Sequence, residues 1–289
     1  MRAYNVILLS TVMTLAFAQA APGPEFEVAT IRPSGNQREG QVKVGLHMDG
    51  AQVRIAYFTL KDYIGMAYRM RVSQVFGPDW ISSDRFDIAA TIPQGHKPDE
   101  FREMLQALLA ERFQLKFHQE QREFSVYALA LGKRPLKLKR VPPDEDTGNS
   151  SEPLEVAGGG SVAGVSVNLG HGSSWSFAPN RFEAKKLSME VFASNLERFA
   201  DRPIVDKTGL QGQFDFAFDI NPEDYQPMLI RSAIAAGVSL PPQALRLLDG
   251  SSSASLSDAL EQIGLRLEPR KEPLDVIVVD NTNKTPSEN

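Results

Sequence analysis

Residues 82–92 read SSDRFDIAATI, and residues 210–220 read LQGQFDFAFDI. In both stretches a Phe-Asp pair opens an alternation of apolar and other side chains, and Phe86 and Phe214 hold the same place in it. A period of two with one apolar face is typical of a half-buried β-strand. The two stretches therefore predict equivalent strands, with Asp87 and Asp215 on their outer faces.

A similar helix is expected before each of these strands. Thr59 and Ser188 are placed to be N-caps, whose hydroxyls accept a free backbone N–H of the first turn. Apolar residues follow each cap at i, i+3, i+4 and i+7, which predicts one buried stripe per helix. Arg69 and Arg198 also fall at equivalent positions. The stripes are Leu60, Tyr63, Ile64 and Ala67 in one helix, and Met189, Phe192, Ala193 and Leu196 in the other.

A second helix and a hairpin are expected after each strand. The helices are marked by Leu105, Leu108 and Leu109 in one copy, and by Leu256, Ala259 and Leu260 in the other. The hairpins are expected at 115–128, with a turn at 118–123, and at 265–278, with a turn at 268–273.

Each half therefore reads strand, helix, strands, helix and hairpin, starting with strand 53–57 in one copy and 181–185 in the other. We predict an α+β fold built by tandem duplication, with mixed or antiparallel sheets and helices packed on them. The alternative is two unrelated α+β pieces of similar patterning. The first repeat is expected to span 21–140 and the second 180–289.

The two copies are expected to differ in two places. The first carries extra strands at 26–32 and 42–48. The second carries an insert at 221–254, with short helices expected at 225–236 and 241–248. Between the copies, residues 141–179 are rich in Gly, Ser and Pro, a composition that predicts a linker.

The N-terminus carries the features of a secretory signal peptide. An apolar run from Val6 to Phe17 is followed by Ala18-Gln19-Ala20, an A-x-A cleavage signal. The run is short for a membrane span, which needs ~20 apolar residues. We predict a signal peptide at 1–20, export to the periplasm or beyond, and no later transmembrane segment. The alternative is an uncleaved anchor.

The bulk composition narrows the class of protein. The chain has no cysteine, so its exported form must rely on its hydrophobic core rather than on disulfides. Its formal net charge of −5 favours solubility and gives no general attraction for nucleic acid. We therefore expect no nucleic-acid partner.

Eight stretches cover most of the mature sequence: FEVATIRPS (26–34), FTLKDYIGMAY (58–68), FGPDW (76–80), DRFDIAA (84–90), MLQALLAERFQLKFHQEQREFSVYALAL (104–131), DRPIVDKTGLQGQFDFAFDI (201–220), IGLRLEPRKEPLDVIVVD (263–280) and PSEN (286–289). Together they are similar to a family of exported proteins known as the soil-associated family. That family is abundant in soil Acidobacteria, carries a domain of unknown function, and has relatives attached to BlaR-type membrane peptidases. It has no established activity, so the resemblance implies a localisation outside the cytoplasm and an architecture, but no reaction.

Each half also loosely resembles the short N-terminal domain of secretins and TonB-dependent receptors. The resemblance rests on the order of elements, on an amphipathic helix such as SLSDALEQIGL (255–265), and on a hairpin such as RLEPRKEPLDVIVVD (266–280). Those modules make protein–protein contacts in the periplasm, which is the kind of role that the resemblance implies.

The short motifs that resemble catalytic signatures lack their required partners. Asp206-Lys207-Thr208-Gly209 contains the K-T-G of serine β-lactamases, but no S-x-x-K supplies the nucleophile and base. A turn after strand 203–205, with Asp206 as its cap and a positive φ at Gly209, explains the motif better. None of the four histidines has a neighbour at a local zinc-binding spacing. We predict no catalytic, cofactor or metal site.

Two segments are candidates for contact with a partner. Pro78, Asp79 and Trp80 follow a glycine, and an exposed Trp is typical of binding surfaces; the alternative is that Trp80 covers a hydrophobic core. A second candidate is the basic run that contains Lys137, Lys139 and Arg140. The alternative there is an edge strand with a solvated basic face, which also discourages aggregation.

Together these features predict an exported, non-enzymatic module for protein interaction or sensing in the cell envelope, whose partner is another envelope protein. The expected mode is β-augmentation at a sheet edge, or contact through the 78–80 turn. The alternatives are a hydrolase that acts on envelope or extracellular material, with a site between the halves, and a small-ligand binding protein.

Overall fold

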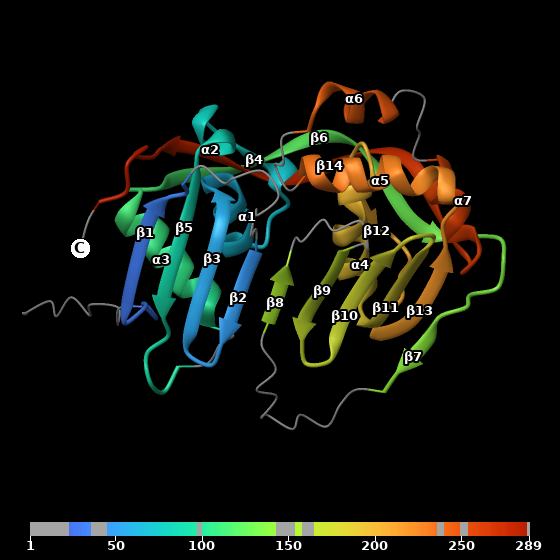
Figure 1. Cartoon of the computed structure of the whole chain (residues 1–289), viewed down its shortest axis with the longest axis horizontal. Helices are drawn as coiled ribbons and strands as arrows, with labels where there is room; N and C mark the ends of the chain where they lie inside the picture. Colours follow the sequence, from blue (N-terminus) through green and yellow to red (C-terminus); the bar gives the residue numbers. More distant parts are fainter. Residues whose placement is uncertain are drawn as a thin grey trace, which may run out of the picture.

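The computed structural model describes residues 23–35, 45–96, 100–142, 154–157, 165–235, 240–248 and 254–287. The predicted signal peptide at 1–20 lies outside these residues. The described chain forms an α+β fold, as predicted. A long sheet runs across the whole molecule (Figure 1). Helices lie against one face of this sheet, and two long strands cross above both halves.

The first half contains the helices and strands that its periodicity predicts. The Thr59 hydroxyl caps the first helix by accepting the backbone N–H of Asp62 at 3.1 Å. The elements are β1 (Val28–Pro33), β2 (Gly45–Asp49), β3 (Gln52–Thr59), α1 (Leu60–Tyr68), the 3₁₀ turn η1 (Val72–Gln74), β4 (Val75–Phe76), α2 (Trp80–Ser83), β5 (Arg85–Thr91), α3 (Phe101–Arg112) and β6 (Lys116–Leu131).

The second half repeats this order with additions. Ser188 caps its first helix, and the two helices expected in the insert are present as α5 and as α6 with η4. The elements are β7 (Lys139–Val141), β8 (Leu154–Ala157), β9 (Val165–Gly170), β10 (Ser173–Ala178), β11 (Arg181–Leu187), α4 (Met189–Leu196), η3 (Glu197–Phe199), β12 (Ile204–Asp206), β13 (Gln213–Asp219), α5 (Pro222–Ala235), α6 (Pro242–Leu245), η4 (Arg246–Leu248), α7 (Ala254–Glu261) and β14 (Leu265–Asn281).

The strands form two sheets. The ten-stranded sheet is antiparallel throughout, in the order β1-β5-β3-β2-β8-β9-β10-β11-β13-β7. The four-stranded sheet has the order β12-β6-β14-β4, with an antiparallel central pair and a parallel strand on each side. Counted inward from its two ends, each sheet presents corresponding strands of the two halves in the same order. The additional strands β8 and β9 lie at the centre of the ten-stranded sheet.

The prediction of two hairpins was wrong. β6 and β14 are continuous strands that pair with each other from Lys116↔Asn281 to Leu131↔Leu265. Residues 118–123 are polar because they lie exposed along β6, and they include no Gly or Asn of the kind that favours a tight turn. Pro269 is tolerated because β14 pairs with β4 only near its C-terminal end.

This pairing makes the two hydrophobic cores share strands. Ile277 and Val279 of β14, a strand of the second half, are buried in the core of the first half. Leu129 of β6 is buried in the core of the second half. β6 and β14 cross the molecule in opposite directions, as Figure 1 shows. The predicted boundaries at 140 and 180 therefore do not separate two independent cores.

The linker predicted at 141–179 is wrong over its described C-terminal part. β9 and β10 bury Val165, Val167, Trp175 and Phe177 against the second core. Each strand alternates apolar and polar residues, a pattern that its Gly- and Ser-rich neighbourhood obscured. Residues 143–153 and 158–164 lie outside the described part of the chain.

The Phe-Asp pair has an equivalent role in each half. The register between β3 and β5 shifts between Ile55 and Phe58, and a matching shift between β11 and β13 follows Ala184. Each shift contains a left-handed residue, Tyr57 at φ 66° and Lys186 at φ 47°. Both features mark a β-bulge, which leaves a backbone N–H outside the regular ladder.

The Asp of each pair bonds to that N–H. Oδ1 of Asp87 accepts the N–H of Tyr57 at 2.8 Å, and Oδ1 of Asp215 accepts the N–H of Lys186 at 2.9 Å. Both carboxylates are half-buried rather than fully exposed on an outer face. The shared order, bulges and caps support the tandem duplication, which stays a prediction.

Candidate functional site

The segment 78–80 lies at the start of α2 in the first half. Pro78 and Asp79 are exposed, and the Asp79 side chain makes no capping hydrogen bond. Trp80 is half-buried and packs against the first core. The indole therefore covers the core, while the two residues before it face solvent.

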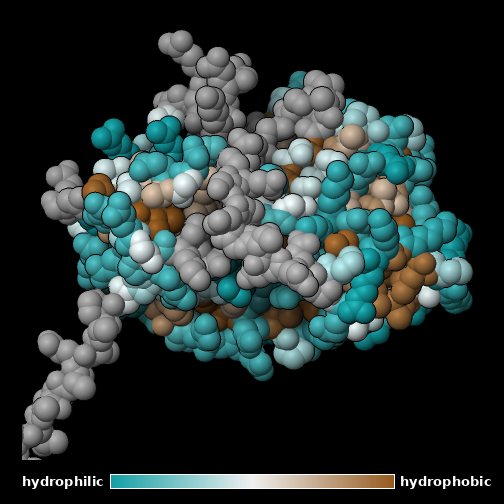
Figure 2. Space-filling model, turned by 90° about the horizontal axis from the view of Figure 1, so that it is seen from below, coloured by the Kyte–Doolittle hydropathy of each residue, from teal (hydrophilic) through white to brown (hydrophobic). Residues whose placement is uncertain are grey.

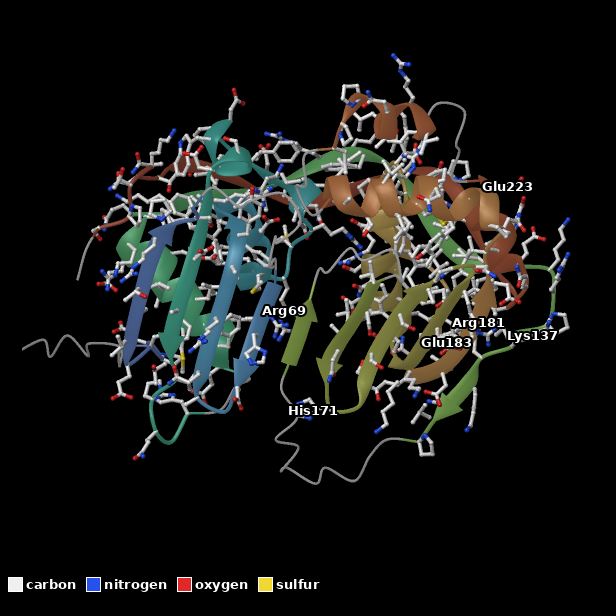
Figure 3. All side chains as sticks on the ribbon, viewed as in Figure 1. Arg69, Lys137, His171, Arg181, Glu183 and Glu223 are labelled. Carbon is white, nitrogen blue, oxygen red and sulfur yellow. The ribbon has the colours of Figure 1, made fainter. Side chains whose placement is uncertain are left out.

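The basic run lies at the opposite end of the long sheet. β7 is its edge strand and pairs only with β13, through Lys139↔Asp215, Arg140↔Phe214 and Val141↔Gln213. Figure 3 shows Lys137 at this outer edge. Lys139 and Arg140 therefore lie in an edge strand, and Lys137 lies just before it. The structure does not bring the basic run together with Pro78, Asp79 and Trp80.

The side chains of this basic edge are free to meet a partner. Lys137, Lys139 and Arg140 are exposed, and none of them forms an ion pair within the described part of the chain. The backbone N–H of Lys137 donates to the carbonyl of Ile263 at 3.1 Å, which fixes the segment beside α7. We use "basic edge" for Lys137, Lys139 and Arg140.

β13, the strand next to β7, extends beyond the basic edge. At its far end the Gln262 side chain accepts the N–H of Asp219 at 3.2 Å and donates to its carbonyl at 2.9 Å, which shields that residue from further pairing. In β13, the backbone groups of alternate residues face the same edge of the strand. Ala217 lies between Asp215, which pairs with Lys139, and Asp219, so its backbone faces the same edge as theirs. No other strand or side chain of the described residues bonds to Ala217 there.

Exposed apolar side chains are spread over many elements. Figure 2 shows several small apolar patches among hydrophilic side chains on the face it presents. Charge therefore distinguishes the basic edge better than apolar area does. The large apolar residues that are exposed among those described are Val28, Val72, Leu131, Leu136, Val191, Ile234, Leu245 and Leu247.

A half-buried polar contact joins the two halves, and no sequence pattern predicted it. Arg71, before η1, forms an ion pair with Glu197 of η3 and donates from Nη2 to the carbonyl of Ile204 at 3.1 Å. Glu197 in turn accepts the N–H of Ile204 at 3.0 Å. Oε1 of Gln74 accepts from both the backbone and the Nη1 of Arg71, each at 3.2 Å.

Burial governs the ionisation of Glu197. Desolvation raises the pKa of Glu197 to about 7, although Arg71 and the N–H of Ile204 act in the opposite direction. The Glu197 carboxyl group and the Arg71 guanidinium remain in direct contact, so this pair connects the two halves. No local sequence signal identifies it, because its residues are far apart in the chain.

The Asp206–Gly209 motif forms the predicted turn at the end of β12. Oδ1 of Asp206 accepts both the N–H and the hydroxyl of Thr208 at 2.8 Å, and Gly209 has a φ of +69°. Lys207 forms an ion pair with Glu272 at 2.7 Å. These bonds account for the motif as a turn.

Histidines and acids do not gather into a metal-binding cluster within the residues that the structure describes. His96 contacts Glu100, and His118 lies 2.8 Å from Asp280 on the exposed surface of β6 and β14. Of the described helices, none is both long and apolar enough to cross a membrane.

Comparison with known proteins gives a family. Residues 61–282 match the family described as "Protein of unknown function (DUF3738)", and the chain belongs to that family. No curated protein and no solved structure matches the chain.

Proposed function

We propose that this member of the DUF3738 family is an exported, non-enzymatic module for protein interaction or sensing in the cell envelope. The signal peptide predicted at 1–20 supports export. The similarity to the soil-associated family, with its BlaR-linked relatives, supports a role in the envelope. So does the loose resemblance of each half to a periplasmic contact domain. The observation that carries the proposal is the basic edge.

The basic edge suits β-augmentation by an extended, acidic segment of another envelope protein. In this mode the main chain of the partner adds a strand to the sheet, and side chains on alternate positions give specificity. The outward backbone of Ala217 offers a bonding position beside β7. Acidic side chains of the partner then meet Lys137, Lys139 and Arg140, so the interaction weakens as salt screens these exposed charges.

An envelope crosslinking experiment with the mature protein tests this proposal. The variant K137E/K139E/R140E reverses the charge of the basic edge. The matched control R32E/R54E/K116E reverses three exposed basic residues elsewhere. We expect the wild type and the control to capture the same partner, and the edge variant to lose it.

Two outcomes contradict the proposal. One is capture of the same proteins by the edge variant and the wild type. The other is a crosslink from the basic edge to residues 144–146 of the same chain, an acidic run outside the described residues, with no other protein recovered. That second result assigns the basic edge to an internal contact.

A further inference from the structure

Arg198 is a charged side chain in the second half that has no acidic partner among the described residues. It lies in η3, with its guanidinium carbon 4.8 Å from the centre of the Trp175 ring. Its Nε is buried and has no hydrogen-bond partner in the described part of the protein. Desolvation lowers the pKa of Arg198 to about 10. The Arg198 side chain is half-buried. Withdrawing a charge from water without an ion pair is costly, and the stacked indole offsets only part of that cost.

Two further polar groups of the same aromatic cluster are buried without a partner among the described residues. They are Nε1 of Trp175 and the hydroxyl of Tyr225. The Phe177 ring connects them, because it lies 5.0 Å from Tyr225 and 4.6 Å from Phe199, which itself lies 6.2 Å from Trp175. Buried groups of this kind are usually paired, so three in one cluster require an explanation.

The first half shows that the fold does not need these groups. Arg69, at the position equivalent to Arg198, is exposed after the end of α1 and has a φ of 54°. Leu46 of β2 pairs with Ile55 as Trp175 of β10 pairs with Ala184. An aliphatic residue therefore fills the place of the indole in the first half.

The remaining donor comes from the insert that only the second half contains. Tyr225 lies on α5, which packs on η3. The three unpaired groups thus come from β10, η3 and α5, and each is specific to the second half. One role shared by all three groups explains why they occur together better than three unrelated unpaired groups do.

We propose that Arg198, Trp175 and Tyr225 form a binding site for a small organic monocarboxylate. Arginine and indole N–H groups only donate, and the phenol can donate, so the missing ligand must supply acceptor oxygens. Glu197 pairs with Arg71 and not with Arg198, so the positive charge of Arg198 has no acidic partner among the described residues. A monoanion neutralises that charge, whereas the second negative charge of phosphate has no cation to pair with among these three groups. The aromatic side chains suit an apolar body on the ligand.

Tryptophan fluorescence can test this proposal on the mature protein. The chain has two tryptophans, so W80F leaves Trp175 as the only one. The probes are acetate, hexanoate and cyclohexanecarboxylate, with hexanamide and inorganic phosphate as comparisons. We expect a saturable change in Trp175 emission with at least one carboxylate, and none with hexanamide.

Substitutions at the two equivalent arginines separate binding from general effects. In the W80F background, R198M should weaken carboxylate binding roughly tenfold or more, the loss expected for a charged hydrogen bond. R69N removes the equivalent exposed charge and should leave binding unchanged. Thermal unfolding checks that each variant folds. If R198M does not fold, R198K keeps the charge without the planar donor set, and we expect it to bind more weakly than the wild type.

Three results overturn the proposal: no saturable response to any carboxylate, equal binding by Arg198 variants that fold, or stronger binding of phosphate. The test is independent of the basic edge. K137E/K139E/R140E should bind the carboxylate as the wild type does, so failure of either proposal can be recognised separately.

Discussion

Glu197 is a carboxyl group whose burial and pairing have opposite effects on its charge. Its contacts with Arg71 and with the N–H of Ile204 favour the ionised form, and burial favours the neutral form. Burial is the larger effect, and the pKa of Glu197 rises to about 7. The ionisation of this contact between the halves therefore changes near neutral pH.

Stability should fall as the pH rises through this range. The folded protein keeps a proton on Glu197 that the unfolded chain has lost, so the stabilisation is fully present below the ordinary pKa of 4.5 and is lost as the pH approaches 7. Between pH 5 and 8 the free energy of unfolding should fall by about 2–3 kcal/mol more in the wild type than in E197Q. Urea denaturation at both pH values measures this difference.

E190Q is the matched control for this measurement, because Glu190 is exposed on α4. It should keep the pH dependence of the wild type. Equal pH dependence in E197Q and the wild type would show that the ion pair with Arg71 keeps Glu197 charged throughout.

At the scale of single residues, the sequence predicted what local chemistry decides. The caps at Thr59 and Ser188 and the turn at Asp206 depend on groups a few residues apart, and all three are present. The half-buried contact of Glu197 and the isolated charge of Arg198 depend on tertiary packing. The alignment of Arg198 with Arg69 gave no sign that one is half-buried and the other exposed.

At the scale of the elements, the bulges of β3 and β11 explain the repeated Phe-Asp pair. Each bulge directs a backbone N–H away from the ladder, and an Asp on the next strand accepts it. The Phe-Asp pair therefore has a structural role in the strands. Each Asp side chain is engaged in a hydrogen bond to the bulge rather than available for catalysis.

Removing one of these carboxylates should cost stability. D215A leaves the N–H of Lys186 without its acceptor and should lower the free energy of unfolding by about 1–2 kcal/mol. D215N keeps an acceptor oxygen and should recover most of that loss. D219A, which removes a surface ion pair with Arg181, should change stability by less than about 0.5 kcal/mol. Equal losses in D215A and D219A would refute the role of the bulge.

The failed hairpin prediction shows a limit of local patterns. Alternation correctly identified residues 124–128 and 274–278 as strand, but it carries no information on the pairing partner. A polar stretch between two apolar stretches fits a turn, and it fits equally a strand that is exposed between two cores. The length of β6 and β14 depends on how they pack against both cores, which local alternation does not show.

At the scale of the whole molecule, the exchange of β6 and β14 joins the halves into one cooperative unit. Each core contains buried residues from a strand of the other half, and the pairing of these strands extends between the cores. Neither half can complete its core alone. The basic edge and the Arg198 cluster both belong to the second half, where it departs from the first, and both rely on this shared framework.

Unfolding observed separately in the two halves tests this framework most directly. W175F reports through Trp80, which packs on the first core, and W80F reports through Trp175 in the second. Circular dichroism measures the loss of stability that each substitution causes by itself. After correction for this loss, both fluorescence signals should follow one transition with one midpoint in urea. Two separate midpoints, with one tryptophan still in a native environment after the other is exposed, would contradict the shared framework.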